Sequence, residues 1–410
     1  MAESGESLQT IDDMNRFVGM KYLKRLGPFL QRLHDEACER DRAGNRELHF
    51  DHLCGMILLS FFNPTLQTLR NLSESSRTTQ VKKKLGAKSA SLGSLSEAMR
   101  LFDSERLLEI IQELIDRIPD ASHHDPRLLK LDQIPTAVDG TLLKRLPQVT
   151  EACFKTRQDR GWKLHTHFEI LRGIPVKARL TDASGKGDAS EKGVLKKELE
   201  PDRCDITDRG YEQFSLFNAI VKAKSSYVFR VRGDHHFQLE EQRELSAEAK
   251  EAGVLEDQAG RMGSEKSVRI EHPDHLQRRI VIQFTPHTKR GGRRRTGATQ
   301  EIVVVTNLLE VPAEVIALLY HQRWMIELFF RWLKCVLSCR HLMSTSQNGI
   351  EIQMYCALIA CLLIQLTAGR EIKPNSSLFT MISLYAQGWA DDDNLQEALE
   401  RQWSAVKKES

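Results

Sequence analysis

The stretch YHQRWMIELFFRWLK, residues 320–334, combines the pattern of a buried helix with a narrow line of polar side chains. An α-helix turns about 100° per residue, so residues three or four positions apart lie on the same side of it. The polar residues with this spacing are Tyr320, Arg323, Glu327, Arg331 and Lys334. The other positions are mostly large and apolar, which predicts a helix that is buried over most of its circumference and has one polar face.

The carboxylate of Glu327 stands among cations on this polar face. One interpretation is a salt-bridged helix surface, because Arg323 and Arg331 each lie four residues from Glu327. An ordinary surface helix, however, is polar over a wider arc. The narrow line therefore favours a cleft or a polyanion as its neighbour, provided that other segments supply partners for Glu327.

The composition indicates a globular protein of two or three domains, with 410 residues of which 40% are hydrophobic and 28% charged. Its net charge of +3 neither requires nor excludes nucleic acid as a partner. Eight cysteines without paired spacing suit a reducing cytosol. The N-terminal MAESGESLQT is unlike a signal peptide, and the apolar run 352–366 is short for a membrane span. We therefore expect a cytoplasmic protein with no membrane partner, in which that run forms a core helix.

Residues 1–130 show helical periodicity almost throughout, which predicts an all-helical N-terminal domain. A basic cluster lies in its middle and consists of Arg70, Arg77, Lys82, Lys83, Lys84 and Lys88. A helix-turn-helix that places these side chains on DNA phosphates and a solvated basic linker both fit this composition.

The pattern changes to strands after residue 130. The run IPTAVDG, residues 134–140, predicts a buried strand that ends at Asp139. The segments 162–170 and 176–182 alternate in polarity and predict a hairpin. His165 and His167 lie on its polar side, where we expect solvent-facing side chains more often than a metal site.

A second short strand is predicted to end at Asp208, before a helix that begins near Tyr211 and a strand over 226–233. The order of strand, hairpin, helix, strand, helix and strand predicts an α/β fold with a mixed sheet. Two strands therefore each present an aspartate at their end. Asp205 and Asp234 are alternatives to Asp208 for the second of these positions.

Residues 234–311 interrupt this alternation with charged, irregular sequence and indicate an insertion. Strands are predicted at 278–286 and 302–308, ahead of Pro312 and the long helix. Between them the loop 287–297 interleaves glycines with the cations Lys289, Arg290, Arg293, Arg294 and Arg295. Such a loop can follow a phosphate backbone, although a solvated loop has the same composition.

The three carboxylates define a chemistry if Asp139, Asp208 and Glu327 meet. They would then bind two divalent ions about 4 Å apart, which activate the attacking oxygen and stabilise the leaving oxygen of a phosphodiester. Hard oxygen ligands suit Mg²⁺ or Mn²⁺. The neighbouring side chains can hold DNA phosphates around these ions, through Tyr320, Arg323, Arg331 and Lys334.

The spacing of Tyr320, Arg323, Glu327 and Lys334 resembles the signature of transposases of the insertion sequence 4 family. The segment VDGTLL, 138–143, is similar to that family's first aspartate motif, and TDRGYEQF, 207–214, to its second. The resemblance covers residues 130–366.

This resemblance implies an RNase H-like mixed-sheet catalytic core with a β-rich insertion, preceded by the all-helical N-terminal domain. It implies Asp139, Asp208 and Glu327 as catalytic residues and ligands of two Mg²⁺ or Mn²⁺ ions. Some relatives hold a flipped base with an insertion-domain tryptophan. This chain has no tryptophan between Trp162 and Trp324, so the resemblance does not extend to a DNA hairpin intermediate, unless Phe284 stacks in its place.

We therefore expect a DNA transposase that cleaves at transposon ends and transfers the 3′-hydroxyl ends to target DNA. Its partners would be double-stranded DNA, in terminal inverted repeats and target, and a second copy of the chain, in the bacterial cytoplasm at the nucleoid. The alternatives are a nuclease without strand transfer and a transposase-derived DNA-binding protein. We expect a helical DNA-binding domain at 1–130 and a catalytic core in two parts, 131–233 and 312–370. The β-rich insertion at 234–311 separates these two parts, and a C-terminal helical region follows at 371–410.

Overall fold

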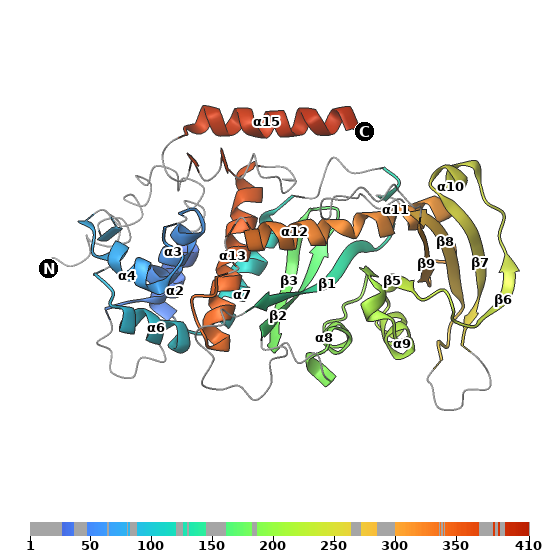
Figure 1. The fold of residues 1–410 in the computed structure, drawn as a ribbon, viewed down its shortest axis with the longest axis horizontal. Coiled ribbons are helices and arrows are strands. Elements are labelled where there is room, and N and C mark those ends of the chain that lie inside the picture. The colour runs from blue at the N-terminus through green and yellow to red at the C-terminus, as the bar shows by residue number, and fades with distance from the viewer. Residues whose placement is uncertain are drawn as a thin grey trace.

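The computed structural model of the chain describes residues 27–36, 47–63, 65–79, 81–82, 88–119, 126–128, 131–144, 161–182, 187–263, 272–284, 300–335, 337, 339, 341–368, 380–381, 384–385 and 390–409. Figure 1 shows an elongated molecule, with the first helices at one end and the last strands of a sheet at the other.

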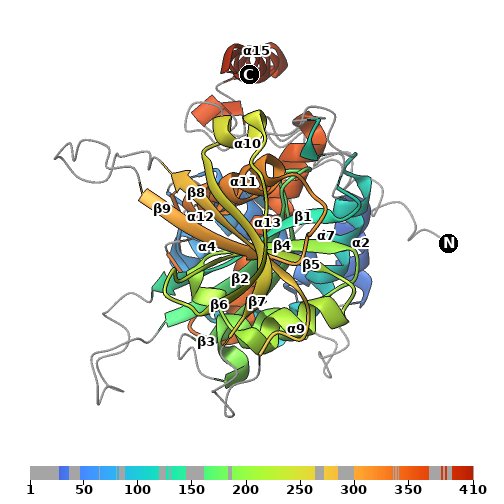
Figure 2. The same ribbon diagram turned by 90° about the vertical axis from the view of Figure 1, so that its right-hand side faces the viewer.

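A nine-stranded mixed sheet forms the centre of the fold, in the order β3-β2-β1-β4-β5-β9-β8-β7-β6. Its first five strands are β1 Ile134–Lys144, β2 Gly161–Glu169, β3 Ile174–Asp182, β4 Arg203–Thr207 and β5 Ser226–Val231. Strand β1 pairs antiparallel with β2 and parallel with β4, which itself pairs parallel with β5. Figure 2 looks along the long axis and shows the strands fanning around one another, as accumulated strand twist requires.

Strand β1 is longer than its sequence pattern predicts. It pairs with β4 only as far as Ala137, opposite Ile206, but it continues to pair with β2 as far as Lys144, opposite Gly161. The prediction that this strand ends at Asp139 is therefore wrong. The strand continues because the hairpin partner supplies backbone hydrogen bonds after β4 has ended.

Four further strands and a short helix lie between β5 and the next long helix. They are β6 Phe237–Gln242, α10 Ala247–Glu251, β7 Val254–Met262, β8 Gln277–Phe284 and β9 Gln300–Thr306. Strand β9 pairs antiparallel with β5, so this segment extends the same sheet. The sequence pattern predicts β8 and β9 but misses β6 and β7. Strand β6 is exposed along most of its length, and bulges interrupt the alternation of both missed strands.

The two faces of the sheet are covered by different helices. One face carries Ala137, Ile206 and Val228, which belong to the large core shared with the N-terminal helices and with the helices that follow β9. The opposite face carries Val138 and Tyr227, which pack with a smaller set of apolar residues. On that side lie η5 Gly187–Ala189, α8 Glu191–Lys197, η6 Arg209–Tyr211 and α9 Phe214–Lys222.

The regular elements described before residue 131 are all helices, as the sequence predicts. They are α2 Gly27–Glu36, α3 Phe50–Phe61, α4 Leu69–Ser76, α6 Leu92–Leu101 and α7 Glu105–Arg117. They share their core with the late helix α13, Gln347–Ala368. The Asn348 amide on α13 donates to the carbonyl oxygens of Met99 and Phe102 at 3.0 and 2.7 Å, which fixes α6 against α13.

Helix α13 contains the apolar run 352–366 and is, among the described residues, the one helix long and apolar enough to cross a membrane. Of its window Gln347–Leu366, 94% is buried inside the protein. This agrees with the predicted core helix. The C-terminal region contains a further helix, α15 Asp392–Glu409.

Candidate active site

The segment 320–334 forms two helices rather than the single one that its pattern predicts. Helix α11, Ala313–Gln322, ends at Arg323, and α12, Trp324–Cys335, begins directly after it. The backbone N–H of Arg323 donates to Tyr320 and that of Ile326 donates to Arg323, so the junction is tightened by three-residue hydrogen bonds. Figure 1 shows α11 and α12 following one another in nearly the same direction.

The polar line differs in exposure from one residue to the next. Tyr320 is buried, Arg323 and Lys334 are half-buried, and Glu327 and Arg331 are exposed. Beneath the line, Ile326, Phe329 and Leu333 are buried in the large core. The Phe329 ring lies 5.4 Å from that of Phe168 on β2, measured between centroids, so α12 is held against the sheet while Glu327 faces outward.

The register of β1 and β4 brings Asp139 and Asp208 to the same level. The parallel pairs end at Ala137 and Ile206, and two further residues on each strand lead to these aspartates. Because side chains alternate along a strand, Asp139 lies on the face of Ala137, which is covered by α11 and α12. The charge of Asp208 raises the pKa of Asp139, which agrees with this placement.

Arg323 connects Asp139 to Glu327. Its Nη1 lies 3.8 Å from Oδ2 of Asp139, and its Nη2 lies 2.5 Å from Oε1 of Glu327. The salt-bridged pair expected from the helix spacing is therefore present, but its arginine also faces the sheet. Two of the three carboxylates that the sequence singles out, those of Asp139 and Glu327, therefore lie at one guanidinium.

The Asp139 carboxyl is held in an environment that disfavours its charge. Burial raises its pKa from 3.8 to about 7, against the opposing effect of the Gly140 N–H, which donates to Oδ1 at 2.7 Å. Asp208 and Glu191 raise this pKa further, and Arg323 lowers it. Burial is therefore the main reason that the charged form of Asp139 is disfavoured, and the neighbouring carboxylates add to it.

Glu191 is a fourth carboxylate at this place, and the sequence patterns did not indicate it. It is the first residue of α8, which Ser190 caps, and its Oε1 lies 2.5 Å from Nζ of Lys163. A Cβ added at Gly140 would lie 3.0 Å from Oε1, and one added at Gly210 would lie 3.4 Å from Oε2. The two glycines of the aspartate motifs therefore leave room for Glu191.

Arg230 on β5 is a second residue that the sequence patterns missed. Burial raises the pKa of Tyr320, and the charges of Arg323 and Arg230 lower it, so both cations lie near the phenol. The signal in the sequence was the alternation of 226–233, which puts Arg230 on the same face as Val228.

The alternatives to Asp208 have other surroundings. Asp205 pairs with Thr136 in the β1–β4 register, so it lies on the face opposite to Asp139. It is buried there, and burial raises its pKa to about 7, while Arg203 and Lys177 lower it. Asp234 is exposed, beyond the end of β5. The register thus favours Asp208 as the neighbour of Asp139.

The two histidines of the β2–β3 hairpin are buried, so the prediction that they face solvent is wrong. Nε2 of His165 lies 2.8 Å from Oγ1 of Thr181, and Nε2 of His167 lies 3.5 Å from Oε2 of Glu198. Burial lowers their pKa values to about 4 and about 3, respectively. The segment after α8, which contains Glu198, covers this side of the hairpin.

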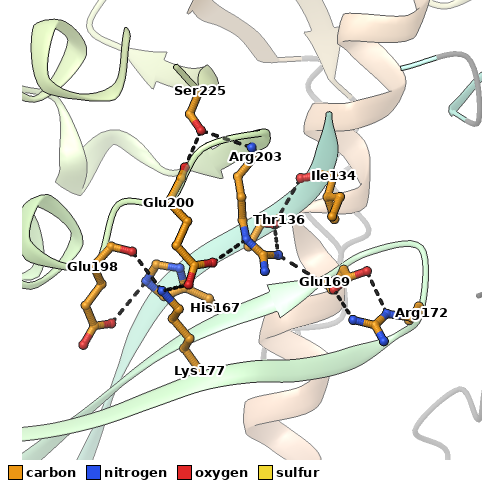
Figure 3. Close-up of polar contacts among 10 residues, drawn as sticks. All are labelled: Ile134, Thr136, His167, Glu169, Arg172, Lys177, Glu198, Glu200, Arg203 and Ser225. Atoms are coloured by element: carbon orange, nitrogen blue, oxygen red, sulfur yellow. Dashed lines mark hydrogen bonds and ion pairs between the residues drawn. The ribbon is translucent and has the colours of Figure 1, made fainter. Parts of the chain in front are cut away.

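A polar network surrounds His167 near the beginning of β4 (Figure 3). Arg203 lies 2.9 Å from Glu200 and 3.8 Å from Glu169, and Lys177 lies 2.6 Å from Glu200. Arg203 begins β4, whereas Asp208 follows the end of that strand. The network is therefore at the opposite end of the strand from the carboxylates and joins β2, β3 and β4.

The remaining predicted DNA contacts are only partly described. Lys82 is described and exposed. The other residues of this prediction lie outside the described residues, namely Lys83, Lys84, Arg293, Arg294 and Arg295.

Comparison with known proteins points to one family. Residues 131–363 match the family described as “Transposase DDE domain”. “Putative transposase y4zB” of Sinorhizobium fredii is 30% identical over 210 residues, which cover 51% of this chain and 54% of that protein. “Probable transposase for insertion sequence element IS5377” of Geobacillus stearothermophilus is 26% identical over 263 residues, covering 64% and 62%. The chain thus matches between half and two thirds of the length of these relatives.

A solved structure also aligns with most of the chain. It is the “Cryo-EM structure of piggyBac transposase synaptic complex with hairpin DNA”, at 10% identity and a TM-score of 0.35, over 96% of this chain and 79% of that one. This likeness is too low to carry an argument. The family match, in contrast, covers more than half of the chain and includes Asp139, Asp208 and Glu327. The chain therefore belongs to the DDE transposases, and its resemblance to the insertion sequence 4 family is confirmed.

Proposed function

We propose that the protein is a DNA transposase that cleaves DNA at the ends of an insertion sequence and joins the freed 3′-hydroxyl ends to target DNA. The observation that carries this proposal is the arrangement of Asp139, in β1 just past its last pair with β4, and Asp208, just past the end of β4, with Arg323 pairing with both Asp139 and Glu327. Carboxylates from two strands and a helix are the groups that metal-assisted phosphoryl transfer needs.

The sheet supports an RNase H-like catalytic core. The strands β3, β2 and β1 pair antiparallel, and β4 and β5 continue the sheet in parallel with β1. Strands β6 to β9 extend this sheet beyond β5. We assign 131–233 and 312–370 to this core and 234–311 to the insertion. We assign 1–130 to a helical DNA-binding domain and 371–410 to a C-terminal helical region.

The donor set fits two Mg²⁺ or Mn²⁺ ions, held by Asp139, Asp208 and Glu327. DDE transposases generally use divalent metals, and all three side chains offer hard oxygen ligands. The raised pKa of Asp139 also fits, because a carboxyl that is buried and lies near other carboxylates is stabilised in its charged form by a bound cation. When bound, such ions would activate the attacking oxygen and stabilise the leaving oxygen.

The side chains of α11 and α12 supply the contacts to DNA in this proposal. Arg323 has donors beyond those used by Asp139 and Glu327, and a guanidinium can hold a phosphate by two hydrogen bonds. Arg331 is exposed next to Glu327 along the helix, and Lys334 lies one turn further. Tyr320 can donate its hydroxyl to a phosphate. These residues would follow one DNA backbone past the carboxylates.

The basic residues Lys82 to Lys84 and Arg293 to Arg295 complete the proposed DNA contacts. The partners are double-stranded DNA, as terminal inverted repeats and as target, and a second copy of the chain in the complex that holds two ends together. The proposed place of action is the bacterial cytoplasm, at the nucleoid.

The test is cleavage and joining of a duplex that carries the inverted repeat found beside the gene, in Mg²⁺ or Mn²⁺. Wild type is compared with Glu327→Ala and with Glu397→Ala on α15. Glu397 makes the same four-residue pair with an arginine, Arg401, at 3.8 Å, and is exposed like Glu327. We expect the wild type and Glu397→Ala to nick the terminus and join the 3′ end to a second DNA.

The Glu327→Ala variant should bind the duplex but neither cut nor join it. Cutting without joining by the wild type would make the protein a nuclease. Binding without cutting by every variant would make it a DNA-binding protein derived from a transposase. Equal cutting by wild type and Glu327→Ala would overturn the role of Glu327.

A further inference from the structure

Three histidines and an aspartate meet where α2 packs against the first turn of α3. His34 is on α2, His49 precedes α3, and Asp51 and His52 are in its first turn. Figure 1 shows α2 and α3 at the N-terminal end of the molecule, away from the central strand β1 that carries Asp139. This cluster is therefore separate from the carboxylates of the candidate active site.

Three of these side chains each place a possible ligand atom in one small cluster. Nδ1 of His34 lies 3.1 Å from Oδ2 of Asp51, and Nε2 of His52 lies 3.6 Å from the same oxygen. All three atoms lie within 4.8 Å of one another. Ligand atoms around a tetrahedral zinc ion, at bond lengths of about 2.0–2.1 Å, are about 3.3 Å apart. The side chains are thus close to a ligand arrangement without rebuilding of the backbone.

The two oxygens of the Asp51 carboxylate differ in their contacts. Among the described residues, its Oδ1 is buried and has no hydrogen-bond partner, although Oδ2 contacts both His34 and His52. A buried carboxylate oxygen without a partner is unfavourable. A simple hydrogen bond between His34 and Asp51 explains only Oδ2, whereas a bound cation would compensate the charge that both oxygens share.

The three imidazole rings of the cluster lie against one another. Burial lowers the pKa of His52, Asp51 raises it, and the neighbouring His34 and His49 lower it again. The rings of His34 and His49 are stacked, with centroids 4.0 Å apart, and two stacked imidazoles repel each other when both are protonated.

We propose that His34, Asp51 and His52 bind one zinc-class transition metal ion, with water in the fourth position. Two imidazole nitrogens and one carboxylate oxygen are a donor set that suits Zn²⁺ and not Mg²⁺. Binding through Nε2 leaves the His52 proton on Nδ1. It therefore gives up the 3.4 Å contact in which the His49 N–H donates to that atom. The ion joins α2 to α3, and thereby to the core that α3 shares with α13.

The test is metal binding by the full chain after treatment with a chelator. Zn²⁺ is titrated against a chromophoric competitor, and Co²⁺ is added separately to record its visible absorption. We expect one tight Zn²⁺ per chain that millimolar Mg²⁺ does not displace. We also expect an intense Co²⁺ band of tetrahedral type.

The variants His34→Ala and His52→Ala should each weaken Zn²⁺ binding at least tenfold and lose the Co²⁺ band. The control His236→Ala changes an exposed histidine that contacts the Gly263 carbonyl, and it should bind like the wild type. Glu327→Gln should also bind Zn²⁺ unchanged, which separates this site from the proposed active site. The proposal fails if the wild type gives no tight Zn²⁺ and no tetrahedral Co²⁺ band, or if His34→Ala binds as the wild type does. The Co²⁺ band of the wild type decides the question even if a variant fails to fold.

Discussion

The guanidinium of Arg278 and the carboxylate of Asp257 form a buried two-point ion pair between β8 and β7, with N–O distances of 2.7 and 2.5 Å. Nη1 of Arg278 also donates to the carbonyl oxygens of Leu308, Leu309 and Val311. These carbonyls lie immediately before α11. The pair therefore fastens the β6–β9 strands to the segment that leads to Tyr320 and Arg323.

Replacing Arg278 by Met should destabilise the protein by about 3–5 kcal/mol, because it leaves the buried Asp257 carboxylate without a counter-charge. Urea unfolding measures this loss. The neighbouring Arg279 pairs with the half-exposed Glu256 at 2.8 Å, and Arg279→Met should cost only about 0–1 kcal/mol. The double variant Arg278→Met/Asp257→Leu should recover part of the loss. Equal costs at 278 and 279 would contradict this account.

The Asp139 carboxyl should make the metal-free protein less stable as pH rises. Its folded pKa of about 7 lies above 3.8, so the folded chain holds a proton that the unfolded chain releases between these values. This stabilising contribution is complete below about pH 4 and lost above about pH 7. Asp139→Asn should therefore equal the wild type near pH 4 and exceed it near pH 8, by on the order of 4 kcal/mol at most.

The measurement is urea unfolding in a chelator at both pH values, with Asp188→Asn as control. Asp188 is exposed and pairs with Lys197 at 2.6 Å. Its replacement should give nearly the same small difference at both pH values. A difference between Asp139→Asn and the wild type that does not grow with pH would show that the carboxyl is not crowded as the geometry indicates.

Divalent metal should offset the loss of stability that the ionised Asp139 carboxylate causes, but not the loss that ionised Asp205 causes. Asp205 is buried and Asp139 is half-buried, and burial raises the pKa of each to about 7, yet they lie on opposite faces of the sheet. Adding Mg²⁺ at pH 8 should stabilise the wild type and Asp205→Asn, by about 2.7 kcal/mol at a hundred times Kd. Asp139→Asn and Asp208→Asn should gain much less. Thermal unfolding with and without chelator makes the comparison, and a Mg²⁺ effect equal in all four proteins would exclude this site.

A methyl group at Gly140 should disturb the ion pair of Lys163 and Glu191. A Cβ there would lie 2.7 Å from Cε of Lys163 and 3.0 Å from Oε1 of Glu191, so Gly140→Ala must displace their ion pair. We expect a loss of about 1–3 kcal/mol and weaker DNA cleavage. Gly93 on α6 is the control, because its added Cβ would meet only Oγ of Ser91 at 3.7 Å. Gly93→Ala should be neutral or stabilising by up to about 1 kcal/mol, measured by urea unfolding, and the opposite order would refute the crowding at Gly140.

The parts of this fold that the sequence predicts are those in which one local pattern decides the structure. The apolar run before Asp139, the alternation of the hairpin and the periodicity of α13 each occur in a short window. What was missed depends on distant partners. The continuation of β1 follows from pairing with β2, and the burial of His165 and His167 follows from the chain around α8.

The candidate site was predicted in the same uneven way. Asp139, Asp208 and Glu327 were identified by motif, while their roles and the metal ions stay predictions. Glu191 was missed because its proximity arises only when α8 folds beneath the strand ends, next to Gly140 and Gly210. The break of the helix at Arg323 was missed because a single three-residue turn leaves the helical periodicity of its neighbours intact.

The pairing of β9 with β5 has a consequence for how the protein avoids aggregation. Without β9, the mostly buried strand β5 would be an edge strand of the sheet. Its unpaired backbone groups could then pair with another molecule. The extended sheet instead ends at β6, which carries Glu240 and Glu241 and has a bulge between Leu239 and Glu241. Charges and a bulge both discourage edge-to-edge pairing. The added strands thus replace an apolar edge strand, β5, with a charged and bulged one, β6, which disfavours pairing between two molecules of the protein.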